Sequence, residues 1–181
     1  MTEAKLVTLK DLTFKSYISY PQIQSKVKEI ATAINKDLAG KSPVFIAVLN
    51  GSFAFAADLL KEITINCEIS FVKLASYKGV KSSGPVRTLI GLDTELQNRD
   101  IIIIEDIVDT GKTLFELLKQ LKMHSPAQIK IASLLVKPDA LLHHIKVDYT
   151  GFEVPDKFLV GYGLDYDGFG RNLKDIYQLS S

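Results

Sequence analysis

The stretch DIIIIEDIVDTGKT, residues 100 to 113, decides the fold of this chain. Its run of isoleucines at 101 to 104 favours a strand, because β-branched side chains pack well on a pleated surface. The run has no polar alternation, which is typical of a strand buried on both faces in a parallel sheet covered by helices. A segment whose apolar positions suit a helix follows at residues 114 to 121. We therefore expect a buried strand, an acidic loop and the N-terminus of a helix in direct succession.

The acidic loop combines three carboxylates with the start of a helix. Backbone N–H groups and the positive end of the macrodipole at Thr110 to Thr113 suit a phosphate group. Glu105, Asp106 and Asp109 would repel that anion, so the candidates for their partners are ribose hydroxyls, a Mg²⁺ ion carrying other phosphates, and positive charge developing on a sugar carbon. A Walker A loop does not fit, because position 106 would have to be glycine. A plain acidic helix cap would need only one short polar residue.

Two later blocks are as distinctive as this stretch. Val136-Lys137-Pro138 ends an apolar run, and PDKFLVGYGLDY at residues 155 to 166 precedes Arg171-Asn172-Leu173. In order and spacing, the three blocks resemble the signature of the purine phosphoribosyltransferases, from roughly residue 20 to residue 178. The resemblance implies the type I phosphoribosyltransferase fold, an α/β domain with a mainly parallel sheet flanked by helices. It also implies purine salvage: transfer of the 5-phosphoribosyl group from phosphoribosyl pyrophosphate to N9 of hypoxanthine or guanine, with Mg²⁺ as cofactor.

The composition describes one ordinary soluble domain. The 181 residues are 46% hydrophobic and 24% charged, which is enough chain to bury a substantial core. The net charge of +1 provides no overall basic field for a nucleic-acid backbone. No stretch approaches the roughly 18 apolar residues of a membrane span, and Met1 to Lys5 opens no secretory signal, so we expect a cytoplasmic protein. The single cysteine, Cys67, excludes an internal disulfide framework, and we expect it to be a buried residue of a strand at 63 to 69.

Repeated segments of strand, turn and helix predict the rest of the sheet. We expect strands at 44 to 49, 69 to 74, 129 to 136 and 158 to 160. A helix begins at Tyr20-Pro21 and ends near Leu38, with Gly40 placed to stop it, and another begins at Phe53. The lead-in at residues 6 to 19 suggests short strands or an irregular segment. By resemblance, residues 1 to 181 form a single phosphoribosyltransferase domain, with a small hood built from the N-terminal segment and residues about 150 to 181.

The resemblance assigns the sugar-phosphate and base sites residue by residue. The 5′-phosphate and the ribose would be held by Glu105, Asp106, Asp109, Thr110, Gly111, Lys112 and Thr113. Asp109 would also take or share the N7 proton of the purine in general acid–base catalysis. Lys137 would donate to the 6-oxo group of the base, Phe158 would stack on the purine, and Leu159 would read the base edge through its backbone.

The resemblance also implies a pyrophosphate site with two departures from the family pattern. Its residues would be Asn50, Gly51, Lys73 and Arg171. Asn50 replaces a lysine that is common in relatives, and residues 167 to 170 replace a bulkier stretch before Arg171. Asp165 would contact Mg²⁺, together with Glu105 and Asp106, and Ser76 and Tyr77 would lead a lid over the site. Relatives are usually homodimers or homotetramers, which is the assembly that we expect.

Two other functions stay open at this level. The same fold could serve a regulator that senses the nucleotide and binds RNA, although the near-neutral charge argues against it. The chain could also be a related transferase that prefers xanthine. By resemblance, backbone carbonyls recognise the group at C2 of the base, so the side chains do not separate hypoxanthine, guanine and xanthine. The adjacent His143 and His144 would point about 100° apart on a helix and have no third ligand at metal spacing, which argues against a metal site there.

Overall fold

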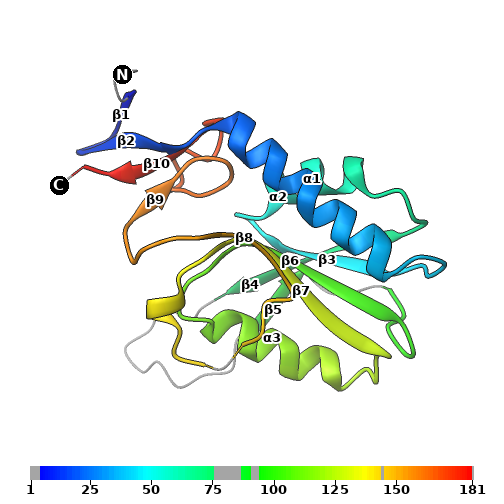
Figure 1. Ribbon diagram of the computed structural model, residues 1–181. Coiled ribbons are helices and arrows are strands. Elements are labelled where there is room, and N and C mark those ends of the chain that lie inside the picture. The colour runs from blue at the N-terminus through cyan, green and yellow to red at the C-terminus, as the bar shows by residue number, and fades with distance from the viewer. Residues whose placement is uncertain (1–4, 76–86, 91–93, 144, 181) are drawn as a thin grey trace.

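The computed structural model describes residues 5–75, 87–90, 94–143 and 145–180 (Figure 1). A six-stranded sheet runs through the centre in the order β5-β4-β3-β6-β7-β8. All its strands are parallel except the edge strand β5, which is antiparallel to β4. Their bounds are β3 Val44–Leu49, β4 Glu68–Ala75, β5 Arg87–Ile90, β6 Asp100–Val108, β7 Gln128–Val136 and β8 Tyr149–Glu153. The predicted fold class, a mainly parallel sheet flanked by helices, is confirmed.

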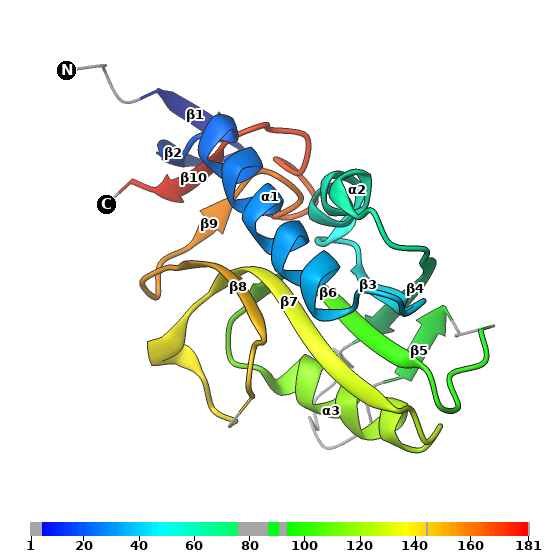
Figure 2. The ribbon, with the colours of Figure 1, turned by 45° about the vertical axis from the view of Figure 1, so that its right-hand side comes forward.

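Helices cover both faces of this sheet (Figures 1 and 2). α1, Tyr20–Asp37, and α2, Phe53–Glu62, lie on one face, and α3, Lys112–Lys122, lies on the other. The isoleucine run at 101 to 104 explains the double cover, because alternate residues pack with α1 and α2 on one side and with α3 on the other. All four side chains are fully buried.

Strand β6 is longer than the isoleucine run predicted. Its ladder with β7 continues through Glu105 opposite Ser133 to Val108 opposite Val136. The first two carboxylates therefore lie within the strand, and the expected acidic loop contains only Asp109. Because successive side chains of a strand alternate, Glu105 and the following Asp106 project to opposite faces of the sheet.

Helix α1 begins and ends as predicted. The Ser19 N–H donates to Gln22 Oε1 at 2.9 Å in a capping box, and Pro21 occupies the first turn. Its apolar face is buried over Ile23, Val27, Ile30, Ala31 and Ile34. Gly40, with φ of +77°, follows the end of the helix in a conformation that favours glycine.

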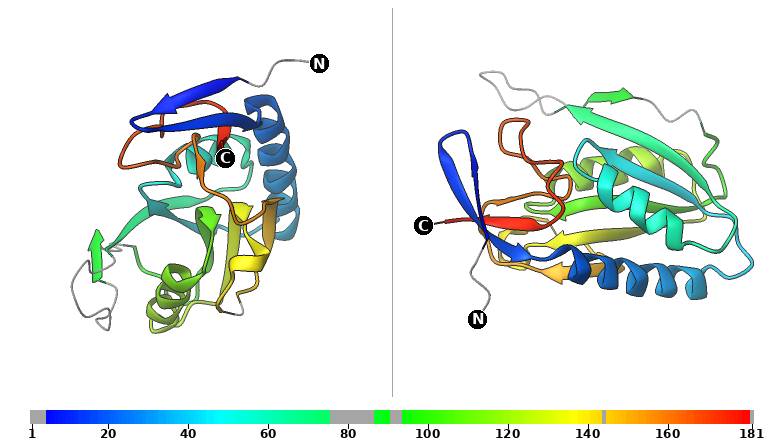
Figure 3. Two further views of the ribbon diagram at one scale, coloured as in Figure 1. Left: turned by 90° about the vertical axis from the view of Figure 1, so that its left-hand side faces the viewer. Right: turned by 90° about the horizontal axis from the view of Figure 1, so that it is seen from above.

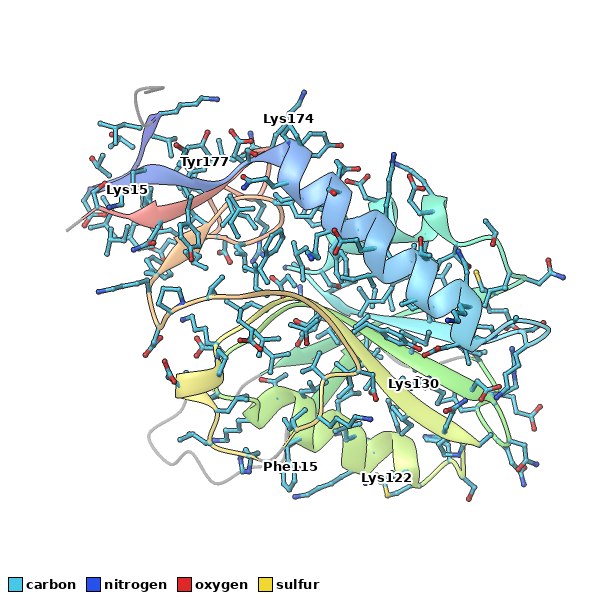
Figure 4. The ribbon with its side chains drawn as sticks, in the orientation of Figure 1. Lys15, Phe115, Lys122, Lys130, Lys174 and Tyr177 are labelled. Atoms are coloured by element: carbon cyan, nitrogen blue, oxygen red, sulfur yellow. The ribbon has the colours of Figure 1, made fainter. Side chains whose placement is uncertain are left out.

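A second sheet, of order β1-β2-β10-β9, joins the two ends of the chain and forms the hood (Figure 3). It consists of the antiparallel strands β1 Leu6–Leu9, β2 Leu12–Ile18, β9 Leu159–Val160 and β10 Ile176–Leu179. Phe14, Val160 and Tyr177 form its core, and Figure 4 labels Tyr177 there. Strand β8 pairs with β7, so residues 149 to 153 belong to the large sheet and the C-terminal part of the hood lies beyond them.

Two local predictions are wrong. Cys67 is exposed and precedes β4, because that strand begins at Glu68, where its pairing with β3 starts. His143 does not lie on a helix, since the chain after the short 3₁₀ turn Pro138–Ala140 is irregular; its ring stacks on Phe115, with the centroids 4.4 Å apart.

Some predictions fall on residues that the structure does not describe. The lid residues Ser76 and Tyr77 and the second histidine, His144, lie outside the described ranges. Within those ranges, no helix is long and apolar enough to cross a membrane.

Candidate active site

Three loops meet at the carboxyl edge of the large sheet, where ligands bind in open α/β sheets. Asn50 and Gly51 follow β3, Asp109 follows β6, and Lys137 follows β7. Because β3, β6 and β7 are adjacent and parallel, these loops lie side by side. The hood lies above the same edge (Figure 1).

The loop between β6 and α3 forms a cradle that suits an anion. Gly111 caps α3 with φ of +76°, and a Cβ atom there would meet Ile145 Cδ1 at 2.7 Å. The Lys112 N–H donates to Thr110 Oγ1 at 3.4 Å. A cavity of 120 Å³, here called the anion cavity, is lined by Glu105, Ile107, Val108, Asp109, Thr110, Gly111, Lys112, Thr113 and Leu114. It brings together every predicted phosphate and ribose residue except Asp106.

Glu105 and Asp106 are acids in a poorly solvated setting. Glu105 lines the anion cavity, whereas Asp106 lies against Gly51, where a Cβ atom would overlap the Asp106 carboxylate. Burial raises the pKa of Glu105 well above its usual range, and the neighbouring Asp106 charge adds to the rise. Burial likewise raises the pKa of Asp106 to about 6, although backbone hydrogen bonds and the Arg171 charge oppose the rise.

A second cavity, here called the base cavity, opens toward the hood. Its volume is 230 Å³, and it is lined by Asp106, Ile107, Asp109, Lys137, Phe158, Leu159, Leu164 and Asp165. This set contains all three residues predicted to bind the purine. Phe158 is supported by Phe14 and Tyr166, whose ring centroids lie 5.9 and 5.7 Å from its own.

Asp109 lines both cavities. The side chain is about half exposed, at 49%, and it accepts a hydrogen bond from Lys137 on the base side. The anion cavity and the base cavity therefore adjoin at this carboxylate.

Lys137 reaches the base cavity from the end of β7. Its Nζ donates to Asp109 Oδ2 and to Asp156 Oδ1, each at 3.0 Å. Burial lowers the pKa of Lys137, but the hydrogen bonds to Asp156 and Asp109 outweigh that effect and leave the pKa raised. A charged N–H donor therefore stands on the cavity wall at neutral pH.

The loop after β3 packs tightly beneath the hood. The Leu49–Asn50 peptide is cis, and Gly51 lies between Asp106 and Gly163, where a Cβ atom on Gly163 would overlap the Gly51 carbonyl oxygen. Lys73 on β4 is in register with Leu49 of β3. The predicted pyrophosphate residues on β4 and on the β3 loop are thus neighbours at one edge of the sheet.

Arg171 joins this group through a tight turn of the hood. Its Nη1 donates to the Gly163 carbonyl at 2.7 Å, and its Nη2 pairs with Asp165 Oδ1 at 2.7 Å. Gly168 and Gly170 take φ of +87° and +96°, and the Gly168 N–H donates to Asp165 Oδ2 at 2.6 Å. The unusual glycine-containing stretch therefore folds back on itself and returns Arg171 to the side of Asp165.

The predicted metal residues form a pair and not a triad. Asp106 and Asp165 line the same cavity, whereas Glu105 faces the anion cavity. Within the described ranges, no group of three or more His, Cys, Asp or Glu side chains could hold a metal ion. Two carboxylates still fit Mg²⁺, because this ion usually keeps water and substrate phosphates as its remaining ligands.

Sequence reasoning gave no role to three polar residues around the site. Asp156 binds Lys137, and its signal in the sequence was its place two residues before Phe158 in the third block. Asp58 on α2 accepts hydrogen bonds from the Tyr162 hydroxyl at 2.8 Å and from the Gln24 amide at 2.7 Å. Asp58 and Tyr162 are 104 positions apart, and no sequence pattern connects them.

The model of the family described as "Phosphoribosyl transferase domain" matches this chain over residues 15–167. The chain therefore belongs to the phosphoribosyltransferase family, and its fold agrees with that assignment. Within it, the chain is similar to the hypoxanthine-guanine phosphoribosyltransferases. That of Lactococcus lactis subsp. lactis is 44% identical over 160 residues, which cover 88% of this chain and 87% of the relative. That of Bacillus subtilis is 44% identical over 163 residues, which cover 90% of this chain and 91% of the relative.

Solved structures agree with these relatives. A hypoxanthine-guanine phosphoribosyltransferase from Bacillus anthracis superposes with a TM-score of 0.85 and 38% identity, covering 92% of this chain and 96% of that chain. A hypoxanthine phosphoribosyltransferase from Staphylococcus aureus superposes with a TM-score of 0.87 and 37% identity, covering 91% of this chain and 90% of that chain.

Proposed function

We propose that this chain is a hypoxanthine-guanine phosphoribosyltransferase of purine salvage. It transfers the 5-phosphoribosyl group from phosphoribosyl pyrophosphate to N9 of hypoxanthine or guanine and releases pyrophosphate. The observation that carries the proposal is that the anion cavity and the base cavity adjoin at Asp109. A phosphate cradle and a base site that share one carboxylate suit a reaction in which a sugar phosphate meets a base.

The anion cavity takes the sugar phosphate. Backbone N–H groups from Asp109 to Thr113 and the N-terminus of α3 bind the 5′-phosphate, with the Thr110 and Thr113 hydroxyls in support. Glu105 from this cavity and Asp106 from the adjoining base cavity hold the ribose hydroxyls. In their ionised forms both carboxylates favour the positive charge that develops at C1′. The burial that raises their pKa values also strengthens this interaction, because little water screens it.

The base cavity takes the purine. Phe158 stacks on the ring, and Leu159 contacts the base edge through its backbone. The Lys137 ammonium can donate hydrogen bonds but cannot accept them, so it matches a 6-oxo group and not the 6-amino group of adenine. This preference selects 6-oxopurines such as hypoxanthine and guanine over adenine.

In the chemical step, the bond between C1′ and the diphosphate oxygen breaks while the bond between C1′ and N9 forms. The purine N7 gives its proton to Asp109, so the base leaves the reaction neutral within the nucleotide. A positioned proton acceptor of this kind is typically worth about 10²- to 10⁴-fold in rate. The position of Asp109 in the lining of both cavities supports this role.

The pyrophosphate product is held beneath the hood. The Gly51 N–H, Lys73 and Arg171 bind it, and Asn50 at the loop supplies no positive charge of its own. Asp106 and Asp165 would hold Mg²⁺, which neutralises the diphosphate charge when it is bound.

A steady-state assay of pyrophosphate release tests the function. The protein is given phosphoribosyl pyrophosphate and Mg²⁺ with hypoxanthine, guanine, xanthine or adenine in separate reactions. Turnover with hypoxanthine or guanine and none with adenine is the expected result. Binding of the sugar phosphate with no turnover of any base would contradict the proposal, and so would turnover restricted to xanthine. The comparisons give no support to the RNA-binding alternative, which a filter-binding assay at low salt checks directly.

The proposal includes one domain over residues 1 to 181, a cytoplasmic location and a homodimer or homotetramer. Exposed apolar side chains on α2 and β4 support self-association, because Phe53, Ile69 and Phe71 are 44%, 40% and 41% exposed. Light scattering after gel filtration tests the assembly, and a monomeric mass would contradict it. Fractionation of the source cells tests the location.

A further inference from the structure

Lys137 has three N–H donors, and two of them are committed in the structure. They bind Asp109 Oδ2 and Asp156 Oδ1, each at 3.0 Å. Among the described residues, the ammonium has no third acceptor within hydrogen-bond reach. Because its side chain is only 8% exposed and lines the base cavity, the remaining N–H is available to a ligand there.

The two carboxylates come from different elements. Asp109 belongs to the loop between β6 and α3, whereas Asp156 belongs to the loop between β8 and β9, which also carries Phe158. That loop is fixed to the large sheet where the Val154 N–H donates to the Val136 carbonyl at 2.9 Å. The Asp156 side chain is 65% exposed. Its hydrogen bond to the nearly buried Lys137 connects it to the base cavity.

We propose that Asp156 is a positioning residue that sets the selectivity for 6-oxo bases. An ammonium with one acceptor can rotate and tilt about that bond, whereas two acceptors on separate elements fix its orientation. With Asp109 and Asp156 in place, the third N–H points at the 6-oxo group of the base. The inference rests on the proposed function and extends it to a residue that has no other assigned role.

The chain contains a matched control for this contact. Near the amino end of β7, Lys130 Nζ binds Asp37 Oδ2 and the Tyr149 hydroxyl, each at 3.1 Å, and the Tyr149 hydroxyl donates to Asp37 at 2.9 Å. We call these three residues the control cluster; Figure 4 labels Lys130. The seven residue steps from Lys130 to Lys137 span about 23 Å of extended chain, at roughly 3.3 Å per residue. Asp37→Asn therefore disturbs a similar aspartate–lysine contact away from the site.

The test compares Asp156→Asn, Asp156→Glu and Asp37→Asn with the unmodified protein. Each is assayed for kcat and KM with hypoxanthine, for KM with phosphoribosyl pyrophosphate, and for inhibition by adenine against hypoxanthine. In Asp156→Asn, kcat/KM for hypoxanthine should fall about tenfold, the scale of one charge-assisted hydrogen bond. The KM for phosphoribosyl pyrophosphate and the inhibition constant of adenine should each change less than about twofold. Asp156→Glu should recover part of the loss, because a carboxylate is again within reach of Lys137. Asp37→Asn should change none of the constants.

Adenine separates this role from a merely structural one. Its 6-amino group is no acceptor for the ammonium, so its binding depends on Phe158 and the cavity shape but not on the direction of the third N–H. An equal loss for hypoxanthine and adenine would show that Asp156 only supports its loop and would overturn the proposal, as would no change for hypoxanthine. If the unmodified protein turned over no 6-oxopurine, the proposed function would fail and this inference with it. A failure confined to the Asp156 variants would reject the inference alone.

Discussion

At the scale of single residues, Asp106 is an acid whose ionisation opposes folding. Burial raises its pKa to about 6, above the value of roughly 3.9 that an unfolded chain has, so the folded state binds the proton more readily. Its ionised form therefore costs stability above pH 6, and that cost disappears as the pH falls from about 6 to about 4.

Asp106→Asn should consequently be more stable than the unmodified protein at pH 8, by at most about 3 kcal/mol, since each pKa unit corresponds to about 1.4 kcal/mol. The difference should shrink at pH 4.5, where Asp106 is protonated in the folded state. Urea unfolding without Mg²⁺ at both pH values measures it. An equal difference at the two values would show that the Asp106 charge does not cause it.

Lys137 is a second single residue with a large expected effect, because its ammonium group is expected to decide which bases react. Lys137→Met keeps the apolar stem and removes the ammonium. The value of kcat/KM for hypoxanthine should fall by roughly 10²-fold or more, since a polar group of the base is left unpaired in the cavity. The affinity for phosphoribosyl pyrophosphate, measured by calorimetry, should stay nearly constant. Lys130→Met in the control cluster should leave both values unchanged, and an equal loss in the two variants would refute the role of Lys137.

At the scale of elements, a partly buried hydrogen bond connects the hood to the helices. Tyr162 follows Gly161 in the hood and donates to Asp58 on α2, and the next residue, Gly163, packs on Gly51. Tyr162→Phe should lower the free energy of unfolding by about 1–1.5 kcal/mol. It should also raise KM for phosphoribosyl pyrophosphate, because the Gly163 contact and the Arg171 hydrogen bond to its carbonyl depend on this anchor.

Tyr149→Phe is the matched control for that change. It removes a hydroxyl bound to Asp37 in the control cluster and should cost similar stability. Its KM for phosphoribosyl pyrophosphate should not change. If both variants raised KM equally, lost stability and not the hood anchor would explain the effect of Tyr162→Phe.

The elements also show what the sequence can and cannot predict. The isoleucines at 101 to 104 predicted a strand covered on both faces, because only a doubly buried strand has no polar side. The extension of β6 through Glu105 and Asp106 was not predictable, because charged residues disfavour strands and the pairing with β7 overrides that preference. The exposure of Cys67 depends on where β4 starts, which its pairing with β3 determines.

At the scale of the whole molecule, the site is assembled from segments that are distant along the chain. Three sequence blocks carried the resemblance. The adjacent parallel strands β6 and β7 bring the first two together, and the third lies in the hood. The hood was expected from both chain ends, and the second sheet is built from them. Contacts such as Lys137 with Asp156, or Asp58 with Tyr162, depend on loop geometry and leave no periodic signal.

The central claim is that sugar phosphate and base react where the two cavities adjoin, at Asp109. The most direct measurement compares Asp109→Asn with the unmodified protein in turnover of hypoxanthine and in binding of phosphoribosyl pyrophosphate. Asparagine keeps the shape of the side chain but cannot take the N7 proton. We expect kcat to fall by about 10²- to 10⁴-fold, with binding of the sugar phosphate changed by less than about threefold. Near-normal turnover by Asp109→Asn would contradict the account.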